Sequence, residues 1–304
     1  MGRIWLWIQE RFPPAAWLLS VFFYLSSAVI VRSVTGAPYL AFSDVVGFVV
    51  VWSYFLMLRV LDEHKDYEQD CISHPDRVLQ RGVVTLSDLK KVGAACFAAQ
   101  IIVNIAFPVD STLSFTVWAL AIAWTFLMTV EFFCKEWLTH HLFVYGFSHM
   151  LVTPMIIYWC FALAADQGYE PCSAPIVMAA ALAFCTGMLF EVTRKTRSSD
   201  EEQDGVDTYS KQIGVRNCIV LASALVAVSA VCVAGIASRG QIFLVSSLLM
   251  AGVAAATIRR LLRFMRNPVI DGRGKNEKVV ALFIIVTYLI LVTSICYDNG
   301  FVWK

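Results

Sequence analysis

The chain has 304 residues, of which 59% are hydrophobic and 15% are charged, and its mean hydropathy is +0.68. This composition is typical of integral membrane proteins and excludes an ordinary water-soluble domain. A net charge of only +1 gives no reason to expect a nucleic-acid partner.

Nine apolar stretches follow one another along the chain, and most approach the ~20 residues that a helix needs to cross a bilayer. They are Ala15–Val31, Tyr39–Val60, Val92–Phe107, Phe115–Phe133, Leu142–Ala164, Ala174–Phe190, Cys218–Ile236, Ile242–Ile258 and Val279–Tyr297. Because the stretches are continuously apolar and do not alternate, they favour helices over a barrel. We therefore expect an all-α integral membrane protein with nine transmembrane helices, forming a single membrane domain over residues 1–304.

Positive charge indicates the orientation. With a cytoplasmic N-terminus and nine crossings, all but three of the 24 Lys and Arg residues lie on the cytoplasmic side, the exceptions being Arg32, Arg239 and Lys304. This is a strong positive-inside bias, and it places the C-terminus on the opposite side. Two long polar segments, residues 62–91 and 191–217, then face the cytoplasm, and segments this long are usually functional when they are ordered.

The first long segment opens with a run of acids. Asp62, Asp66 and Asp70 recur at every fourth residue, and Glu63 lies beside them. On a helix, like charges at this spacing share a face and repel one another, which is a poor arrangement for stability alone. A divalent cation would remove the repulsion, and Mg²⁺ commonly combines carboxylates with substrate phosphates. The run predicts a diphosphate-binding site at the membrane boundary; a solvated charged loop is the alternative.

Three arginines lie close to this run. Arg59 precedes Asp62 by about one helical turn, while Arg77 and Arg81 follow the run. Guanidinium groups match phosphate oxygens with paired hydrogen bonds, so these residues are candidates for diphosphate binding. Their alternative role is to fix the topology.

The second long segment combines both charges. Glu191 and Lys195 are one helical turn apart, with Arg194 adjacent, so a metal ligand and two cations can face one cavity. Asp200 and Asp204 repeat the four-residue spacing of the first run, although a solvated loop of mixed charge explains them as well. Glu191 ends an apolar helix, where an ionisable group usually has a function.

Two further polar residues, Lys135 and His149, lie near the predicted cytoplasmic side and inside the fifth apolar stretch, respectively. Lys135 can bind a diphosphate oxygen or pair with Glu131, four residues before it. His149 lies inside an apolar stretch, where we expect a hydrogen-bonded interior residue and not a base.

The nine-helix layout with two acidic loops resembles the UbiA superfamily of intramembrane prenyltransferases over nearly the whole chain. The shared features are Asp62-Glu63-x-x-Asp66-x-x-x-Asp70 in place of the family's Asn-Asp-x-x-Asp-x-x-x-Asp, Arg77 and Gly82 after it, Lys135 after the fourth helix, and Thr208 with Gly214 at the end of the second loop. The second acidic signature departs from the family's Asp-x-x-x-Asp, because Glu191-Val192-Thr193-Arg194-Lys195 occupies its place. Either Asp200 and Asp204 substitute for it or Glu191 serves alone, and the departure suggests a divergent branch.

The resemblance implies a helical bundle with a cytoplasm-facing cavity and Mg²⁺ as cofactor. The metal ligands that it implies are Asp62, Glu63, Asp66, Asp70, Glu191, Asp200 and Asp204. The diphosphate-binding residues are Arg59, Arg77, Arg81, Lys135, Arg194 and Lys195. The residues closest to the chemistry are Asp66, Asp70, Lys135 and Glu191.

Three functions follow from this reading. The first is transfer of a prenyl group from a prenyl diphosphate to an aromatic or lipid acceptor. The second is cyclisation of the prenyl cation without an acceptor, as in the terpene cyclases of the same superfamily. The third is a carrier or permease without catalysis, since charges inside membranes also mark transport paths.

Overall fold

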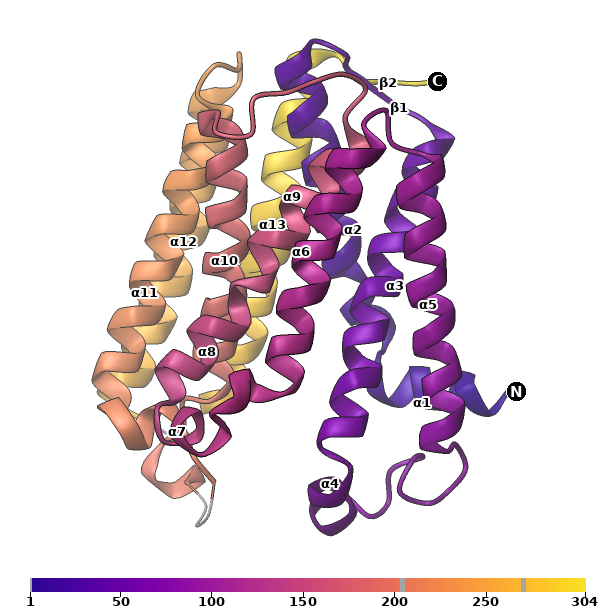
Figure 1. The fold of residues 1–304 in the computed structure, drawn as a ribbon. Coiled ribbons are helices and arrows are strands. Elements are labelled where there is room, and N and C mark those ends of the chain that lie inside the picture. Colours follow the sequence, from indigo (N-terminus) through magenta and orange to yellow (C-terminus); the bar gives the residue numbers. More distant parts are fainter. Residues whose placement is uncertain (1, 203–205, 269–271) are drawn as a thin grey trace.

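The computed structural model describes residues 2–202, 206–268 and 272–304, and it is almost entirely helical (Figure 1). The helices and strands, in chain order, are α1 (Arg3–Arg11), α2 (Pro14–Thr35), β1 (Tyr39–Leu40), α3 (Phe42–Lys65), α4 (Tyr67–Ser73), α5 (Leu86–Ala106), α6 (Ser111–Thr129), η1 (Glu131–Phe133), α7 (Lys135–His140), α8 (Leu142–Met150), α9 (Val152–Ala164), α10 (Ala174–Arg194), η2 (Ser199–Glu201), α11 (Tyr209–Ala237), α12 (Phe243–Arg266), α13 (Gly272–Asn299) and β2 (Val302–Trp303). Asp204, one of the predicted metal ligands, lies outside the described residues.

Within the described ranges, nine helices are long and apolar enough to cross a membrane, with α8 and α9 together forming one of them. The count confirms the prediction, but several ends differ. α3 continues to Lys65 and α10 to Arg194, so both acidic segments begin on helices. The fourth span ends earlier than expected, at Thr129 and not at Phe133, because the backbone then turns into a left-handed conformation.

Ordinary end signals explain where several helices begin and end. Pro14 occupies the first turn of α2, and Gly36 ends that helix with φ of 74°. Thr85 caps α5 by accepting a hydrogen bond from the Asp88 N–H, and the Asp88 carboxylate bonds back to Thr85. Thr208 caps α11 in the same way through its hydroxyl oxygen.

The long helices run side by side and alternate in direction, so the two chain termini lie at opposite ends of the bundle (Figure 1). α1, α4 and α7 all lie at the end that holds the N-terminus. α2, α9, α10 and α13 pack against one another in the interior. The outer helices α11 and α12 expose large apolar side chains such as Val231 and Leu248, as helices that face lipid do.

The end that holds the C-terminus contains a buried charged cluster. β1 and β2 pair in parallel there, with Tyr39 opposite Val302. The Arg32 guanidinium is 3% exposed and lies 2.7 Å from a carboxylate oxygen of Asp44. Its Nε also lies 3.1 Å from Asp166. This arginine, one of the three exceptions to the charge bias, is therefore neutralised inside the protein.

Candidate functional site at the N-terminal end of the bundle

Asp62 and Asp66 lie where α3 ends. The Asp66 N–H donates a 2.9 Å hydrogen bond to the Asp62 carbonyl, so the two residues are one helical turn apart. The Asp62 side chain is 54% exposed, and its nearest basic group is the Arg59 guanidinium at 3.7 Å. Asp66 is exposed as well and ends the regular helix before α4 begins. Both carboxylates are thus accessible to a ligand.

Glu63 lies in a different environment from its neighbours. It is 1% exposed, and one carboxylate oxygen lies 2.6 Å from Arg11 of α1 and 2.6 Å from Arg59. Its other oxygen has no hydrogen-bond partner in the described chain. Two arginines therefore hold this carboxylate inside the protein, and the geometry gives it a structural role in tying α1 to α3. Its role as a metal ligand stays a prediction, for which the unpaired oxygen is the available atom.

α1 also holds the rest of the first segment. Asp70 bonds Arg77 at 2.5 Å and lies 3.6 Å from Arg11. The Glu10 carboxylate accepts a 2.9 Å hydrogen bond from the Val78 N–H. No sequence signal predicts this role of α1, because its contacts join residues that are more than 50 positions apart in the chain. Arg81 is exposed, and its guanidinium contacts no acceptor among the described residues.

Lys65 connects this segment to the fourth and fifth spans. Its Nζ lies 2.6 Å from a Glu131 oxygen and 3.1 Å from the Tyr145 hydroxyl. The alternative in which Lys135 pairs with Glu131 is therefore not observed: Glu131 is buried against Lys65, whereas Lys135 is exposed. Over the ranges that the structure describes, Lys135 makes no ion pair, so its amino group is available to an anion at this end of the bundle.

A left-handed turn holds Glu131 in place. Glu131, Phe132 and Phe133 have φ values of 49°, 51° and 59°, a region that costs non-glycine residues roughly 1–3 kcal/mol each. The turn buries Glu131 and places Phe132 edge-on to His149 and Trp124. Strain of this kind clusters at functional sites, where surrounding contacts maintain it.

The second segment reaches the same place from α10. Glu191 lies 2.7 Å from Arg194 and 2.8 Å from Lys195, so the predicted proximity of these three residues is observed. The Lys195 Nζ also lies 5.3 Å from the centre of the Tyr145 ring, and the Lys65 Nζ lies 5.5 Å from it. Tyr145 therefore joins the two charged segments, although they are distant in the sequence.

The remaining acids of the second segment contribute less. Asp200 is exposed, and within the described part of the chain its side chain accepts a hydrogen bond only from its neighbour Ser199. Glu202 organises the segment instead, because its carboxylate accepts hydrogen bonds from Thr208 and Ser210 at 2.7 and 2.6 Å. Nothing in these contacts brings Asp200 to the first acid run.

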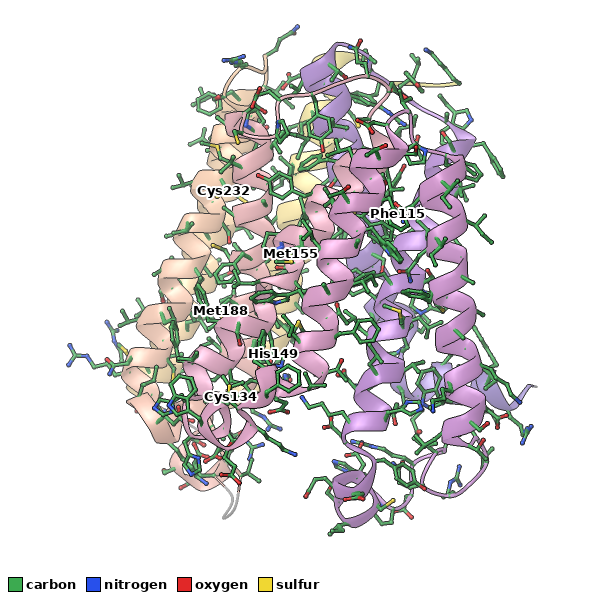
Figure 2. All side chains as sticks on the ribbon, viewed as in Figure 1. Phe115, Cys134, His149, Met155, Met188 and Cys232 are labelled. Atoms are coloured by element: carbon green, nitrogen blue, oxygen red, sulfur yellow. The ribbon has the colours of Figure 1, made fainter. Side chains whose placement is uncertain are left out.

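A small pocket opens beside Asp62. Asp62 and Lys65 of α3 line it together with Thr125 and Thr129 of α6 and His149 of α8. The other lining side chains are apolar. Figure 2 shows His149 among the helices, towards the end of the bundle where Cys134 and α7 lie. The pocket therefore connects the acid run to the apolar interior.

The carboxylates of the candidate site can be matched to the ligands that Mg²⁺ requires. Among the described side chains, no three His, Cys, Asp or Glu groups form a ready-made metal site. Mg²⁺ usually needs only one or two protein carboxylates besides phosphate oxygens and water. Asp62 and Asp66 meet this requirement, whereas one oxygen of Glu63 and both oxygens of Glu191 contact basic side chains. The residues present thus fit the metal if a diphosphate supplies further oxygens.

The charge state of Asp66 agrees with this fit. Its pKa is raised above the ordinary value, first by partial loss of hydration; Lys65 opposes the shift, and Asp70 adds to it. A cation placed among these carboxylates would relieve the repulsion that contributes to the shift.

Comparison with known proteins agrees with the fold. No curated protein matches the sequence. One similar solved structure is described as giving structural and mechanistic insights into the biosynthesis of digeranylgeranylglyceryl phosphate synthase in membranes; it is 14% identical, with a TM-score of 0.69 over 98% of this chain and 100% of that one. Another is the apo structure of a UbiA homologue from Aeropyrum pernix K1, which is 13% identical, with a TM-score of 0.64 over 92% of this chain and 98% of that one. At these identities the likeness concerns the fold alone.

The sequence itself gives the family. A family model described as the UbiA prenyltransferase family matches residues 20–271, which include both charged segments and eight of the nine candidate spans in full or nearly so. With this match, and with the nine-span bundle seen in the described residues, the chain belongs to the UbiA prenyltransferase family.

Proposed function

We propose that the protein binds a prenyl diphosphate with Mg²⁺ at the N-terminal end of the bundle and transfers the prenyl group to an aromatic or lipid acceptor. Family membership supports the prenyltransferase type of activity. The observation that carries the proposal is the convergence of Lys65 and Lys195 on Tyr145, because it brings the acid run and the Glu191 group to one place. We place this end of the bundle at the cytoplasmic face, from the positive-inside bias.

Asp62 and Asp66 would hold the metal, with Asp70 close by. Bound Mg²⁺ would neutralise the charge that builds up on the departing diphosphate. Arg77, Arg194 and Lys135 have side chains at this end that can bind the remaining phosphate oxygens. In the ionisation step, the electron pair of the carbon–oxygen bond leaves with the diphosphate and an allylic cation remains. Fixed positive groups aimed at a departing anion are usually the main catalytic contribution.

The prenyl chain would extend from this site towards the apolar interior. Tyr145 and Phe132 contact His149, which lines the pocket, and Trp124 packs on Phe132. Aromatic faces can stabilise a cation by about 0.5–2 kcal/mol each. The same aromatic surroundings favour a second candidate function, a terpene cyclase in which the cation reacts within its own chain. A carrier function has no such observation in its favour.

Turnover assays can separate these functions. The purified protein in lipid nanodiscs would receive Mg²⁺ and geranyl, farnesyl or geranylgeranyl diphosphate, first without and then with aromatic or lipid acceptors. Diphosphate release and organic products would both be measured. We expect product only when an acceptor is present; a cyclic product without acceptor would replace transfer by cyclisation.

The acid run supplies the controls. The double variant Asp66→Asn with Asp70→Asn should lower turnover on the order of 100-fold or more, because the metal and diphosphate lose their ligands. Asp76→Asn, an exposed acid in the same segment, is the matched control and should behave like the wild type. Equal turnover in all three proteins would contradict the proposed site.

A further inference from the structure

One residue that lines the pocket beside Asp62, His149, has a buried ring nitrogen without a hydrogen-bond partner in the described chain. His149 is 9% exposed, and its Nε2 has no hydrogen-bond partner among the described residues. His149 is also one of the residues that line the pocket. A buried polar atom without a partner is uncommon in a native protein and calls for an explanation.

The surroundings of His149 fix the role of each ring nitrogen. Nδ1 lies 2.8 Å from the Tyr145 carbonyl oxygen, which can only accept a hydrogen bond. In the neutral ring, Nδ1 therefore carries the hydrogen and Nε2 carries the lone pair. The ring stacks on Tyr145 with a centre distance of 4.0 Å and an angle of 15°, and Phe132 meets it edge-on. These contacts hold the imidazole in one orientation.

His141 makes the same local contacts as His149, so these contacts alone do not indicate a catalytic role. Its Nδ1 lies 2.8 Å from the Trp137 carbonyl, again four residues back, and its ring stacks on Trp137 with a centre distance of 4.3 Å. His141, however, is exposed and does not line the pocket. What distinguishes His149 is a buried, unpartnered ring nitrogen on a residue that lines the same pocket as Asp62 and Lys65.

We infer that Nε2 of His149 accepts the proton that the acceptor loses when it captures the prenyl cation. The inference rests on the proposed function and deepens it. A bond forms between the cation's carbon and a hydroxyl oxygen or aromatic carbon of the acceptor, and the hydrogen on that atom passes to Nε2. The diphosphate has already taken the electron pair of the broken carbon–oxygen bond. The resulting imidazolium then returns its proton to water.

The position of the pocket suits this step. Asp62 belongs both to the proposed metal site and to the pocket lining, so an acceptor in the pocket would lie next to the carbon that the diphosphate leaves. Thr125 and Thr129 add hydroxyl groups to the wall. The reacting group of an acceptor that reaches the pocket would thus have the base, polar contacts and the electrophile close by, as a reaction between two bound groups requires.

Charged groups around His149 must be considered before its pH behaviour is used as a test. Lys65 comes from α3, Glu131 from η1 and Lys195 from the end of α10, and Asp62 lines the same pocket. Both lysines are paired with acids, Lys65 with Glu131 and Lys195 with Glu191. Variants of these residues are therefore unsuitable as controls, and the comparison should change His149 alone.

The test uses His149→Gln and His149→Asn, with His141→Gln as the matched control, all as full-length protein in nanodiscs. Binding of a non-ionisable prenyl thiolodiphosphate with Mg²⁺ reports on the folded diphosphate site. Single-turnover product formation with acceptor reports on the complete reaction. We expect binding within about twofold of the wild type in every variant, but product formation about 10²- to 10⁴-fold slower in both His149 variants. At saturating Mg²⁺ and substrate, the wild-type and His141→Gln rates should fall as an imidazole becomes protonated. The His149→Gln rate should lack this step and keep only the decrease at lower pH that the metal-binding carboxylates cause.

Each outcome decides one point. If His149→Gln forms product at the wild-type rate with the wild-type pH profile, the inference is wrong and the proposed function stands. If thiolodiphosphate binding is lost with product formation, His149 has a structural role and the inference is again wrong. If the wild type neither binds the analogue nor forms product with any acceptor, the proposed function itself fails. ¹⁵N NMR of histidine-labelled wild type provides a measurement that needs no variant: a hydrogen on Nε2 of the neutral ring would overturn the inference.

Discussion

The side-chain nitrogen of Lys65 lies 3.1 Å from the hydroxyl oxygen of Tyr145 and donates a hydrogen bond to it. Lys195, which belongs to the second charged segment, also lies near this tyrosine, with its Nζ 5.3 Å from the ring centre. One aromatic side chain thus has contacts with a cation from each charged segment. This arrangement couples the two halves of the proposed diphosphate site.

Removing the Tyr145 hydroxyl should therefore weaken the reaction without unfolding the protein. Tyr145→Phe keeps the ring near both lysines but loses the hydrogen bond to Lys65, and a bond to a charged group contributes about 1.5–3 kcal/mol. We expect turnover to fall about 10- to 100-fold. Diphosphate release measures the effect, and Tyr297→Phe at an exposed position is the control. An unchanged rate would show that the hydroxyl does not position Lys65.

Glu63 should matter for stability more than its neighbours. Glu63→Gln leaves Arg11 and Arg59 without their carboxylate, and removing one partner of a buried ion pair typically costs about 3–5 kcal/mol. Thermal unfolding in detergent should show a clearly lower Tm. Glu68→Gln, which changes an exposed glutamate of α4, should leave Tm unchanged. If both variants unfold like the wild type, the Arg11 contact does not stabilise the bundle.

Protonation of Asp66 should have opposite effects on two quantities: it should stabilise the metal-free protein and weaken Mg²⁺ binding. Because its folded-state pKa is raised, protonation of this group stabilises the metal-free protein as pH falls, and this contribution is lost as pH rises through the folded-state pKa. Mg²⁺ binding needs the ionised carboxylate, so affinity should fall with pH sooner than for an ordinary aspartate. Tm measured against pH with and without Mg²⁺ checks both effects. Asp66→Asn should remove this contribution to the pH dependence and weaken the stabilisation by Mg²⁺.

Glycine at position 133 should relieve strain in the left-handed turn. Phe133 is 83% exposed, so Phe133→Gly loses little packing while removing the cost of a positive φ. We expect a gain of about 1 kcal/mol in the free energy of unfolding. Phe107→Gly is a suitable comparison, because Phe107 is also exposed but has φ of −109°. That variant should be destabilised; stabilisation of both would assign the effect to surface hydrophobicity and not to the backbone.

Apolar length and charge bias were enough to predict the nine spans and the all-helical bundle. Each span has to satisfy its backbone hydrogen bonds internally, so a run of about 20 apolar residues leaves few alternatives to a helix. The helix ends were less predictable. The polar residues Asp62 to Lys65 continue α3 beyond the apolar stretch, and no hydropathy signal marks that extension.

The pairing of charges within the site was only partly predictable. Glu191, Arg194 and Lys195 are close in sequence, so their contact followed from helix geometry. The Lys65–Glu131 pair depends on a left-handed turn that no glycine or asparagine indicates. Of the two alternatives for Lys135, the local i to i+4 pairing with Glu131 is therefore not observed. Contacts made by distant segments cannot be deduced from local spacing.

Because α1 lies outside the candidate spans, the protein can lose the contacts of α1 with the acidic segment and still remain inserted in the bilayer. A protease that cut the chain between Arg11 and Pro14 would leave the candidate spans of the described chain continuous, so the bundle would stay in the bilayer. The released peptide would nevertheless carry away the cation that Glu63 and Asp70 share. If the cut protein stays in the membrane while its acidic segment becomes less ordered, then α1 stabilises the site without being needed for membrane insertion.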